Sequence, residues 1–271
     1  MSTVARGMEK KPTIKINLKP DTLNLENQKF QHRPLSQPLF LNSVPKCGTH
    51  LLKNIIRMFV PLDQQYQAQF IQLRNLREHW GALSDERNFM SYGHLLFDDR
   101  SAAATGLVRH ILLVRDPYDW VLSRARFFVS EEFQGFELLK KGIIKTDAIL
   151  NMMILGIMES AEPLASLFSY NAVAWLPTAH LVRYEELIGA VKNLESDESE
   201  AYFRDLLDAC GIEMPEDWRE RVRVGSDRKQ SGTASENLSG LTIEFPKVLP
   251  DLQKKMVDMV APGLREILGY K

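Results

Sequence analysis

The chain reads SVPKCGTHL over residues 43–51, and this stretch decides the fold. An apolar run, LFLNSV at 39–44, precedes it, and an amphipathic segment, LLKNIIRMF at 51–59, follows it. That order predicts a buried strand, a tight loop and a helix. Gly48 lets successive backbone N–H groups converge at the helix N-terminus, whose partial positive charge favours an anion, and Lys46 adds a full charge. We therefore predict that this loop binds a phosphate or sulfate group.

A second informative stretch reads HILLVRDPYDWVLSR over residues 110–124. It opens with a short, unbroken apolar run, which is typical of a parallel strand buried on both faces. Asp116 can cap the helix that follows, and Pro117 suits its first turn. Arg115 falls at the carboxyl end of the strand, where open α/β sheets bind their ligands. Ser123 follows about two helical turns later, so it can share an anion with Arg115 if the helix leans back across the sheet edge.

Together the two stretches resemble the sulfotransferases that use 3'-phosphoadenosine 5'-phosphosulfate (PAPS). In that family the first loop holds the 5'-phosphosulfate, and a downstream Arg-Asp-Pro segment, with a Ser eight residues after its Arg, holds the 3'-phosphate. The matching residues are Pro45, Lys46, Gly48 and Thr49 in the first motif, and Arg115, Asp116, Pro117 and Ser123 in the second. Cys47 replaces the family's Ser but can still offer its N–H, and His50 replaces a Thr or Ser but can also donate to an anion. The resemblance implies that the whole loop, Arg115 and Ser123 bind the donor.

Three further segments gain an expected role from the same resemblance. Residues 89–96 are predicted to form a strand that ends in a turn, with His94 at the end of the strand. The family places its general base at this position. An imidazole suits the removal of a proton from an acceptor hydroxyl because its pKa lies near neutrality. A polar cap on a strand end is the alternative for this residue. Tyr184 opens a segment like the family's Tyr-Glu-Asp-Leu, in which the Tyr frames the nucleotide pocket. Arg228 and Lys229 match the basic pair of a family loop that folds over the 3'-phosphate.

Composition narrows the class of protein without naming a substrate. A formal net charge of −1 over 271 residues gives no bulk field that would recruit nucleic acid or an anionic membrane. The two cysteines, Cys47 and Cys210, form neither a disulfide framework nor a zinc set. The N-terminus lacks a signal-peptide apolar region, and no apolar run is long enough to span a bilayer. We expect a cytoplasmic protein with no nucleic-acid partner.

These observations predict a single α/β domain over residues 34–271, with a central parallel sheet flanked by helices and a P-loop-like anion loop. Residues 1–33 are expected to form a loosely held arm, with an edge strand at 13–18. The resemblance implies sulfuryl transfer from PAPS to an acceptor hydroxyl, without a metal. The Met- and Leu-rich region 146–175 is expected to be helical core, and part of it, with Phe127 and Phe128, to favour a lipophilic alcohol or phenol as acceptor.

Two other classes stay open at this point. One is an ATP-dependent phosphotransferase, although the chain contains no Gly-x-x-x-x-Gly-Lys-Ser/Thr string and Lys46 precedes Gly48 rather than following it. The other is a non-catalytic nucleotide-binding protein of the same fold, in which His94 would be dispensable.

Overall fold

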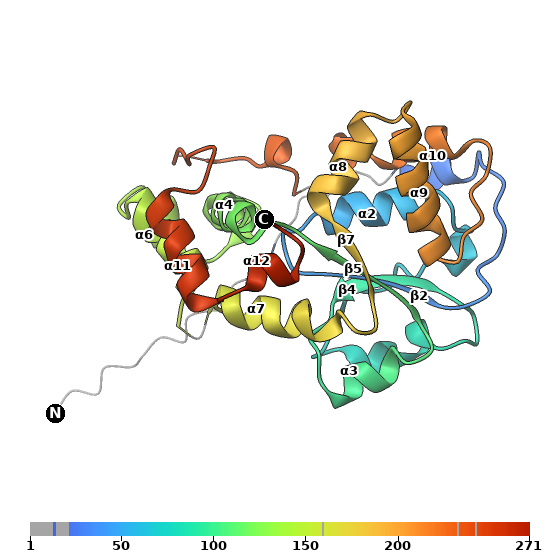
Figure 1. Ribbon diagram of the computed structural model, residues 1–271, viewed down its shortest axis with the longest axis horizontal. Coiled ribbons are helices and arrows are strands. Elements are labelled where there is room, and N and C mark those ends of the chain that lie inside the picture. The colour runs from blue at the N-terminus through green and yellow to red at the C-terminus, as the bar shows by residue number, and fades with distance from the viewer. Residues whose placement is uncertain (1–12, 15–21, 159, 232, 242) are drawn as a thin grey trace.

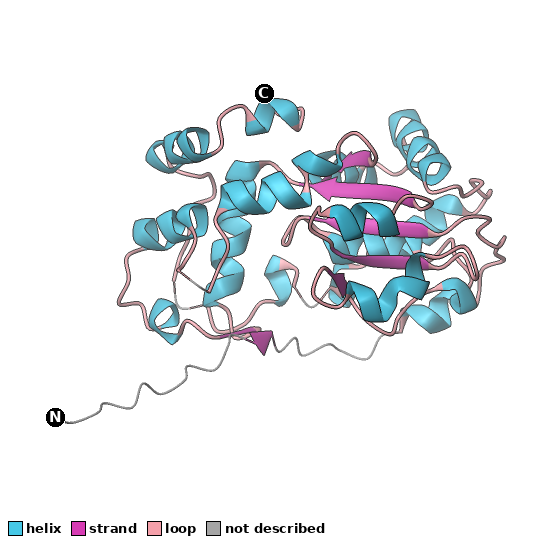
Figure 2. Cartoon of the chain, turned by 90° about the horizontal axis from the view of Figure 1, so that it is seen from below, coloured by secondary structure: helices cyan, strands magenta, loops and turns pink. Residues whose placement is uncertain are grey.

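A central parallel sheet organises the computed structural model, which describes residues 13–14, 22–158, 160–231, 233–241 and 243–271. Within this part of the chain, five strands run parallel in the order β3-β4-β2-β5-β7, and helices cover both faces of the sheet (Figures 1 and 2). The strands of this sheet are β2 (Leu39–Ser43), β3 (Ile71–Gln72), β4 (Met90–His94), β5 (Arg109–Val114) and β7 (His180–Arg183). The predicted fold class is therefore confirmed.

Helices α2, α8, α9 and α10 lie on one face of the sheet, and α3 and α7 lie on the other (Figure 1). A further group, α4, α6 and α11, packs together beyond the carboxyl ends of the strands. The α-helices are α1 (Leu23–Asn27), α2 (Thr49–Ile56), α3 (Asp99–Ala104), α4 (Pro117–Val129), α5 (Glu137–Lys140), α6 (Thr146–Leu155), α7 (Leu164–Asn171), α8 (Tyr184–Lys192), α9 (Asp197–Ala209), α10 (Trp218–Gly225), α11 (Asp251–Val260) and α12 (Leu264–Ile267). Short 3₁₀ helices are η1 (Leu62–Gln64), η2 (Leu76–Leu83), η3 (Val173–Trp175), η4 (Arg228–Gln230) and η5 (Ser235–Asn237). None of the helices in the described ranges is both long and apolar enough to cross a membrane.

The two central strands are buried on both faces, as their apolar sequences predict. All five residues of β2 are buried, and Ile111 to Val114 in β5 have no exposed surface. The parallel register aligns the strand ends, because Ser43 pairs with Leu113, and Val114 pairs with Arg183. The loops that follow β2, β5 and β7 therefore start from one edge of the sheet, where ligands bind in open α/β folds.

Both predicted strand–loop–helix units are present. The loop between β2 and α2 is residues 44–48, and two residues separate the end of β5 from the start of α4. Asp116 caps α4, since its side chain accepts a hydrogen bond of 2.9 Å from the N–H of Tyr118, and Pro117 is the first helical residue. The local signals for capping and for a proline in the first turn were thus sufficient to place this helix.

The N-terminal segment differs from the expected loose arm where the structure describes it. Leu23 in α1 is buried, and the Asn27 amide donates to the backbone carbonyls of Arg57 at 2.6 Å and Val60 at 3.0 Å. Residues 22–33 therefore belong to the folded body. The strand β1 (Thr13–Ile14) pairs antiparallel with β6 (Phe133–Gln134) and is not an edge strand of the main sheet. The rest of the predicted arm, residues 1–12 and 15–21, lies outside the described residues.

The Met-rich region 146–175 is helical, as expected, but only part of it is core, because Leu155 and Met158 are exposed. Ile149, Leu150 and Met153 of α6 have no exposed surface and pack among α4, α7 and α11. The break between α6 and α7 falls at Gly156, whose φ is +84°. A Cβ there would lie 2.7 Å from the carbonyl oxygen of Ala161, so only glycine fits where the chain turns back.

Candidate active site

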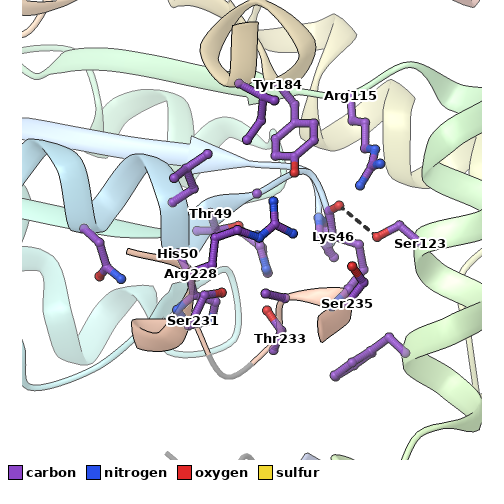
Figure 3. Close-up of a pocket in the computed structure, with 18 of the residues that line it drawn as sticks. Lys46, Thr49, His50, Arg115, Ser123, Tyr184, Arg228, Ser231, Thr233 and Ser235 are labelled. Atoms are coloured by element: carbon purple, nitrogen blue, oxygen red, sulfur yellow. Dashed lines mark hydrogen bonds between the residues drawn. The ribbon is translucent and has the colours of Figure 1, made fainter. Parts of the chain in front are cut away.

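A cavity of about 790 Å³ opens at the carboxyl edge of the sheet. Its walls come from the loop between β2 and α2, the segment after β3, the end of β4, helices α4 and α8, and the loop that follows α10 (Figure 3). Of the residues that the sequence analysis singled out, the cavity is lined by Lys46, Gly48, Thr49, His50, His94, Arg115, Ser123, Tyr184 and Arg228. Segments separated by more than 180 residues thus converge on one space.

The loop before α2 has the backbone conformation of an anion nest. Lys46 has a φ of +70° and Gly48 a φ of +100°, so the chain turns to point its N–H groups inward. Among the described residues, no protein acceptor binds the N–H groups of Gly48, Thr49 or His50, which open α2. These donors are available to a ligand.

Lys46 is a half-buried cation whose surroundings disfavour its charge. Burial, and secondarily the nearby Arg115 charge, lower the pKa of Lys46 to about 7. Its Nζ lies 3.8 Å from the ring centroid of Phe127, a cation–π contact that favours the charged form. An anion in the nest would offset both unfavourable causes, so this lysine is poised to respond to ligand charge.

Arg115, Ser123 and Tyr184 surround the same loop. The Arg115 guanidinium lies 4.6 Å from the centroid of the Tyr184 ring, and the Ser123 hydroxyl lies 3.5 Å from the backbone oxygen of Lys46 (Figure 3). Helix α4 thus leans back over the sheet edge, which brings Ser123 to the side of the cavity where Arg115 projects. The Tyr184 ring covers Gly48 so closely that a Cβ at that glycine would lie 2.5 Å from Cδ2 of the ring.

The C-terminal segment braces this cluster. The Tyr270 hydroxyl donates to Oε2 of Glu185 at 2.8 Å, while Oε1 of Glu185 lies 4.0 Å from Nε of Arg115. Arg265 donates to both carboxylate oxygens of Asp116, at 3.2 Å and 2.9 Å. Burial, and secondarily the Glu185 charge, raise the pKa of Tyr270, so it acts as a hydrogen-bond donor. Sequence reasoning missed both residues, because neither belongs to a motif.

His94 ends β4 with a defined tautomer. Its Nδ1 lies 2.7 Å from the carbonyl oxygen of Ser43 and 3.2 Å from the hydroxyl of the same residue. A carbonyl can only accept, so Nδ1 carries the proton and Nε2 carries the lone pair. Burial lowers the pKa of His94 to about 4, and burial followed by the Lys53 and Lys46 charges lowers the pKa of His50 to about 3. Both imidazoles are therefore neutral near pH 7.

Two predicted site residues do not reach the cavity. Cys47 has no exposed surface and its N–H donates to Val44 at 3.2 Å, so neither its thiol nor its amide faces a ligand. Burial raises the pKa of that thiol. Lys229 is exposed and does not line the cavity, and its backbone N–H donates to the Asp227 carboxylate at 2.9 Å. Its neighbour Arg228 does line the cavity and pairs with Glu236 at 2.5 Å.

Other lining residues were not predicted. Arg126 lies three positions after Ser123 on α4, so helical spacing alone could have placed it on the same face. Phe127 lines the cavity as expected, whereas Phe128 and the α6 methionines do not. Polar side chains from loops complete the walls and carried no sequence signal: Gln69, Gln72, Arg74, Asn75, Ser231, Thr233 and Ser235. Within the described ranges, no cluster of three or more His, Cys, Asp or Glu residues could hold a metal ion.

Comparison with known proteins supports the architecture. Neither a protein-family model nor a characterised protein sequence matches the chain. Among solved structures, the chain is similar to the mouse sulfotransferase SULT7A1 complexed with PAP, with a TM-score of 0.53 and 15% sequence identity over 92% of this chain and 94% of that one. At this identity the likeness shows the fold: this chain has the fold of a sulfotransferase.

Proposed function

We propose that the protein is a PAPS-dependent sulfotransferase, which moves a sulfuryl group from PAPS to the hydroxyl of a small-molecule acceptor. The observation that carries the proposal is the convergence of Lys46, the unpaired N–H groups of the nest, Arg115 and Ser123 on one cavity of a chain with the sulfotransferase fold. Both stretches that resemble the sulfotransferase motifs, residues 43–51 and 110–124, contribute to this convergence.

In the proposed complex, the nest and Lys46 bind the 5'-phosphosulfate of PAPS. Arg115 and Ser123 bind the 3'-phosphate, with Arg228 across the cavity as a third contact. Tyr184 would lie against the adenosine. A phosphate at the 3' position is the feature that separates this donor from ATP, so the Arg115 cluster provides the selectivity. Guanidinium groups suit this task because they form bidentate hydrogen bonds with phosphate.

The proposed reaction is an in-line displacement at sulfur. The acceptor hydroxyl loses its proton to Nε2 of His94, its oxygen bonds to sulfur, and the bond between sulfur and the bridging oxygen breaks. Lys46 and the nest offset the charge that develops on the bridging and sulfuryl oxygens. Ser43 holds the imidazole through Nδ1 and so keeps Nε2 as the accepting nitrogen. Bound donor would add negative charge beside His94, which raises the pKa of the imidazole and makes it a better base.

The test compares two calorimetric titrations. One uses PAP (3'-phosphoadenosine 5'-phosphate), the product that remains when PAPS has lost its sulfuryl group, and the other uses ATP with Mg²⁺. We expect PAP to bind at micromolar or lower concentration, and Arg115→Ala to weaken it roughly 30-fold or more, because truncating one partner of a buried charge pair costs at least ~2 kcal/mol. Arg204→Ala is the matched control, since Arg204 is exposed on α9 and does not line the cavity. Tighter binding of ATP than of PAP would overturn the proposal.

A further inference from the structure

The wall of the cavity nearest His94 combines one aromatic ring with several polar side chains. The short strand β3 pairs with β4 so that Gln72 lies opposite His94, and the Phe70 ring lies 4.5 Å from the imidazole, centroid to centroid. The segment 69–75 thus forms the wall beside the proposed base. It contributes Gln69, Gln72, Arg74 and Asn75 to the cavity lining, with Phe70 as its aromatic member.

The four polar side chains divide into two groups. Asn75 holds the backbone of the segment, and the other three are available to a ligand. The Asn75 amide accepts from the N–H of Gln72 at 2.8 Å and donates to the carbonyl of Phe70 at 2.9 Å, which fixes the turn. In the described part of the chain, no hydrogen bond or ion pair engages the side chains of Gln69, Gln72 or Arg74. The cavity therefore has amide and guanidinium groups beside His94 with unused hydrogen-bonding capacity.

Positive charge predominates around the cavity. The lining carries six basic side chains and one carboxylate, that of Asp227; the basic residues are Lys46, Arg74, Arg115, Arg126, Lys192 and Arg228. Arg115 and Arg228 have carboxylate partners, and both belong to the proposed donor clamp. Arg74 stands apart, on the β3 side, two residues beyond the position that pairs with His94. A cation placed there attracts an anionic group on whichever molecule approaches the base.

We infer that the acceptor is a polar, hydroxylated molecule that carries an anionic group, such as a carboxylate or sulfate. Arg74 binds the anionic group, and the amides of Gln69 and Gln72 bind its other polar groups. This inference rests on the proposed function, and it replaces the lipophilic alcohol or phenol that the Met-rich region had suggested. That region contributes no residue to the cavity lining, and neither does Phe128.

The test compares matched acceptors with labelled PAPS: methyl glucuronide against methyl glucoside, and 4-hydroxyphenylacetate against 4-hydroxyphenylacetamide. In the wild type we expect kcat/KM to favour the anionic member by about 10-fold or more, the effect of one charge-assisted hydrogen bond. Arg74→Gln should remove that preference while the Kd for PAP stays within about twofold, as expected for a residue that contacts only the acceptor. Arg77→Gln is the matched control, because Arg77 is exposed nearby but does not line the cavity.

Three results would overturn the inference while leaving the donor assignment intact. These are equal use of the neutral members, a preference that survives Arg74→Gln, and tight PAP binding with transfer to neither anionic acceptor. A large loss of PAP affinity in Arg74→Gln would assign this residue to the donor and also overturn it. Absence of PAP binding by the wild type would instead refute the proposed function itself.

Discussion

Binding of PAP should draw a proton onto Lys46. Burial and then the Arg115 charge lower the pKa of this lysine to about 7. Phosphate oxygens in the nest would place negative charge beside Nζ and return the pKa toward its ordinary value near 10.4. The pKa is thus raised on binding. The favourable contribution of the lysine is fully present below about pH 7 and declines as the pH rises from there toward the bound-state pKa.

The size of the effect follows from the pKa of about 7. At pH 8 only about one-tenth of the free protein carries the Lys46 charge, so PAP binding should take up about 0.9 proton. Between pH 7 and the bound-state pKa, affinity should fall about tenfold per pH unit. The window from about pH 7.5 to pH 9 is the informative one, since the second ionisation of a phosphate, near pH 6, is then complete.

Calorimetric titration in two buffers of different ionisation enthalpy, for example triethanolamine and Tris, neither of which supplies an anion that binds the nest, measures this uptake directly. Lys46→Arg is the matched control, because a guanidinium stays charged throughout this range and should bind PAP without taking up a proton. Lys46→Met should bind more weakly, also without uptake. A wild-type uptake near zero at pH 8 would refute the reasoning, and so would an unchanged uptake in Lys46→Arg, which would assign the proton to another group.

Three further predictions concern separate parts of the site. Gly48→Ala should weaken PAP binding and lower the thermal midpoint by calorimetry, since φ is +100° and the left-handed conformation costs a residue with a Cβ about 1–2 kcal/mol; Gly189→Ala on α8, where an added Cβ meets nothing within 4 Å, should not. His94→Gln should keep the wild-type Kd for PAP and lose sulfuryl transfer by roughly 10²-fold or more; retained transfer would return His94 to a structural role. Tyr270→Phe should weaken PAP binding about fivefold at unchanged fold stability by circular dichroism, because Glu185 loses a hydrogen bond worth about 1 kcal/mol and draws Arg115 away from the phosphate; an affinity equal to that of the wild type would limit the C-terminal brace to packing.

The donor side of the cavity could be predicted from sequence because its parts are contiguous. A nest needs neighbouring N–H groups, so Lys46, Gly48 and the start of α2 must be neighbours in the chain. Arg115 and Ser123 are likewise linked by one strand end and one helix. The burial of Cys47 could not be predicted in this way. The positive φ of Lys46 and Gly48 on either side turns Cys47 into the core, and no residue-type match reveals the direction of a side chain.

The remaining parts of the site depend on contacts between distant segments. Tyr270 and Arg265 reach Glu185 and Asp116 across 85 and 149 positions. Arg265 belongs to the short helix α12, and Tyr270 follows that helix. The strand β3 is two residues long, too short for an apolar periodicity to mark it. Helix α1, with 5 residues, is likewise too short for a periodic pattern to mark it. Its Asn27 is buried, and the amide donates to the backbone carbonyls of Arg57 and Val60.

The order of the strands bears on the direction of the proposed transfer. β2 lies between β5 and β4, so the nest that follows β2 is central, the Arg115 clamp that follows β5 lies on one side, and His94 at the end of β4 lies on the other. In-line displacement requires that the leaving group and the attacking oxygen stand on opposite sides of sulfur. With the sulfuryl group held at the nest, a donor that extends toward Arg115 leaves the opposite side of sulfur facing His94 and the 69–75 wall. The geometry that in-line transfer needs would therefore follow from strand order, and acceptor choice would fall to the residues on the β3 side, which no donor contact constrains.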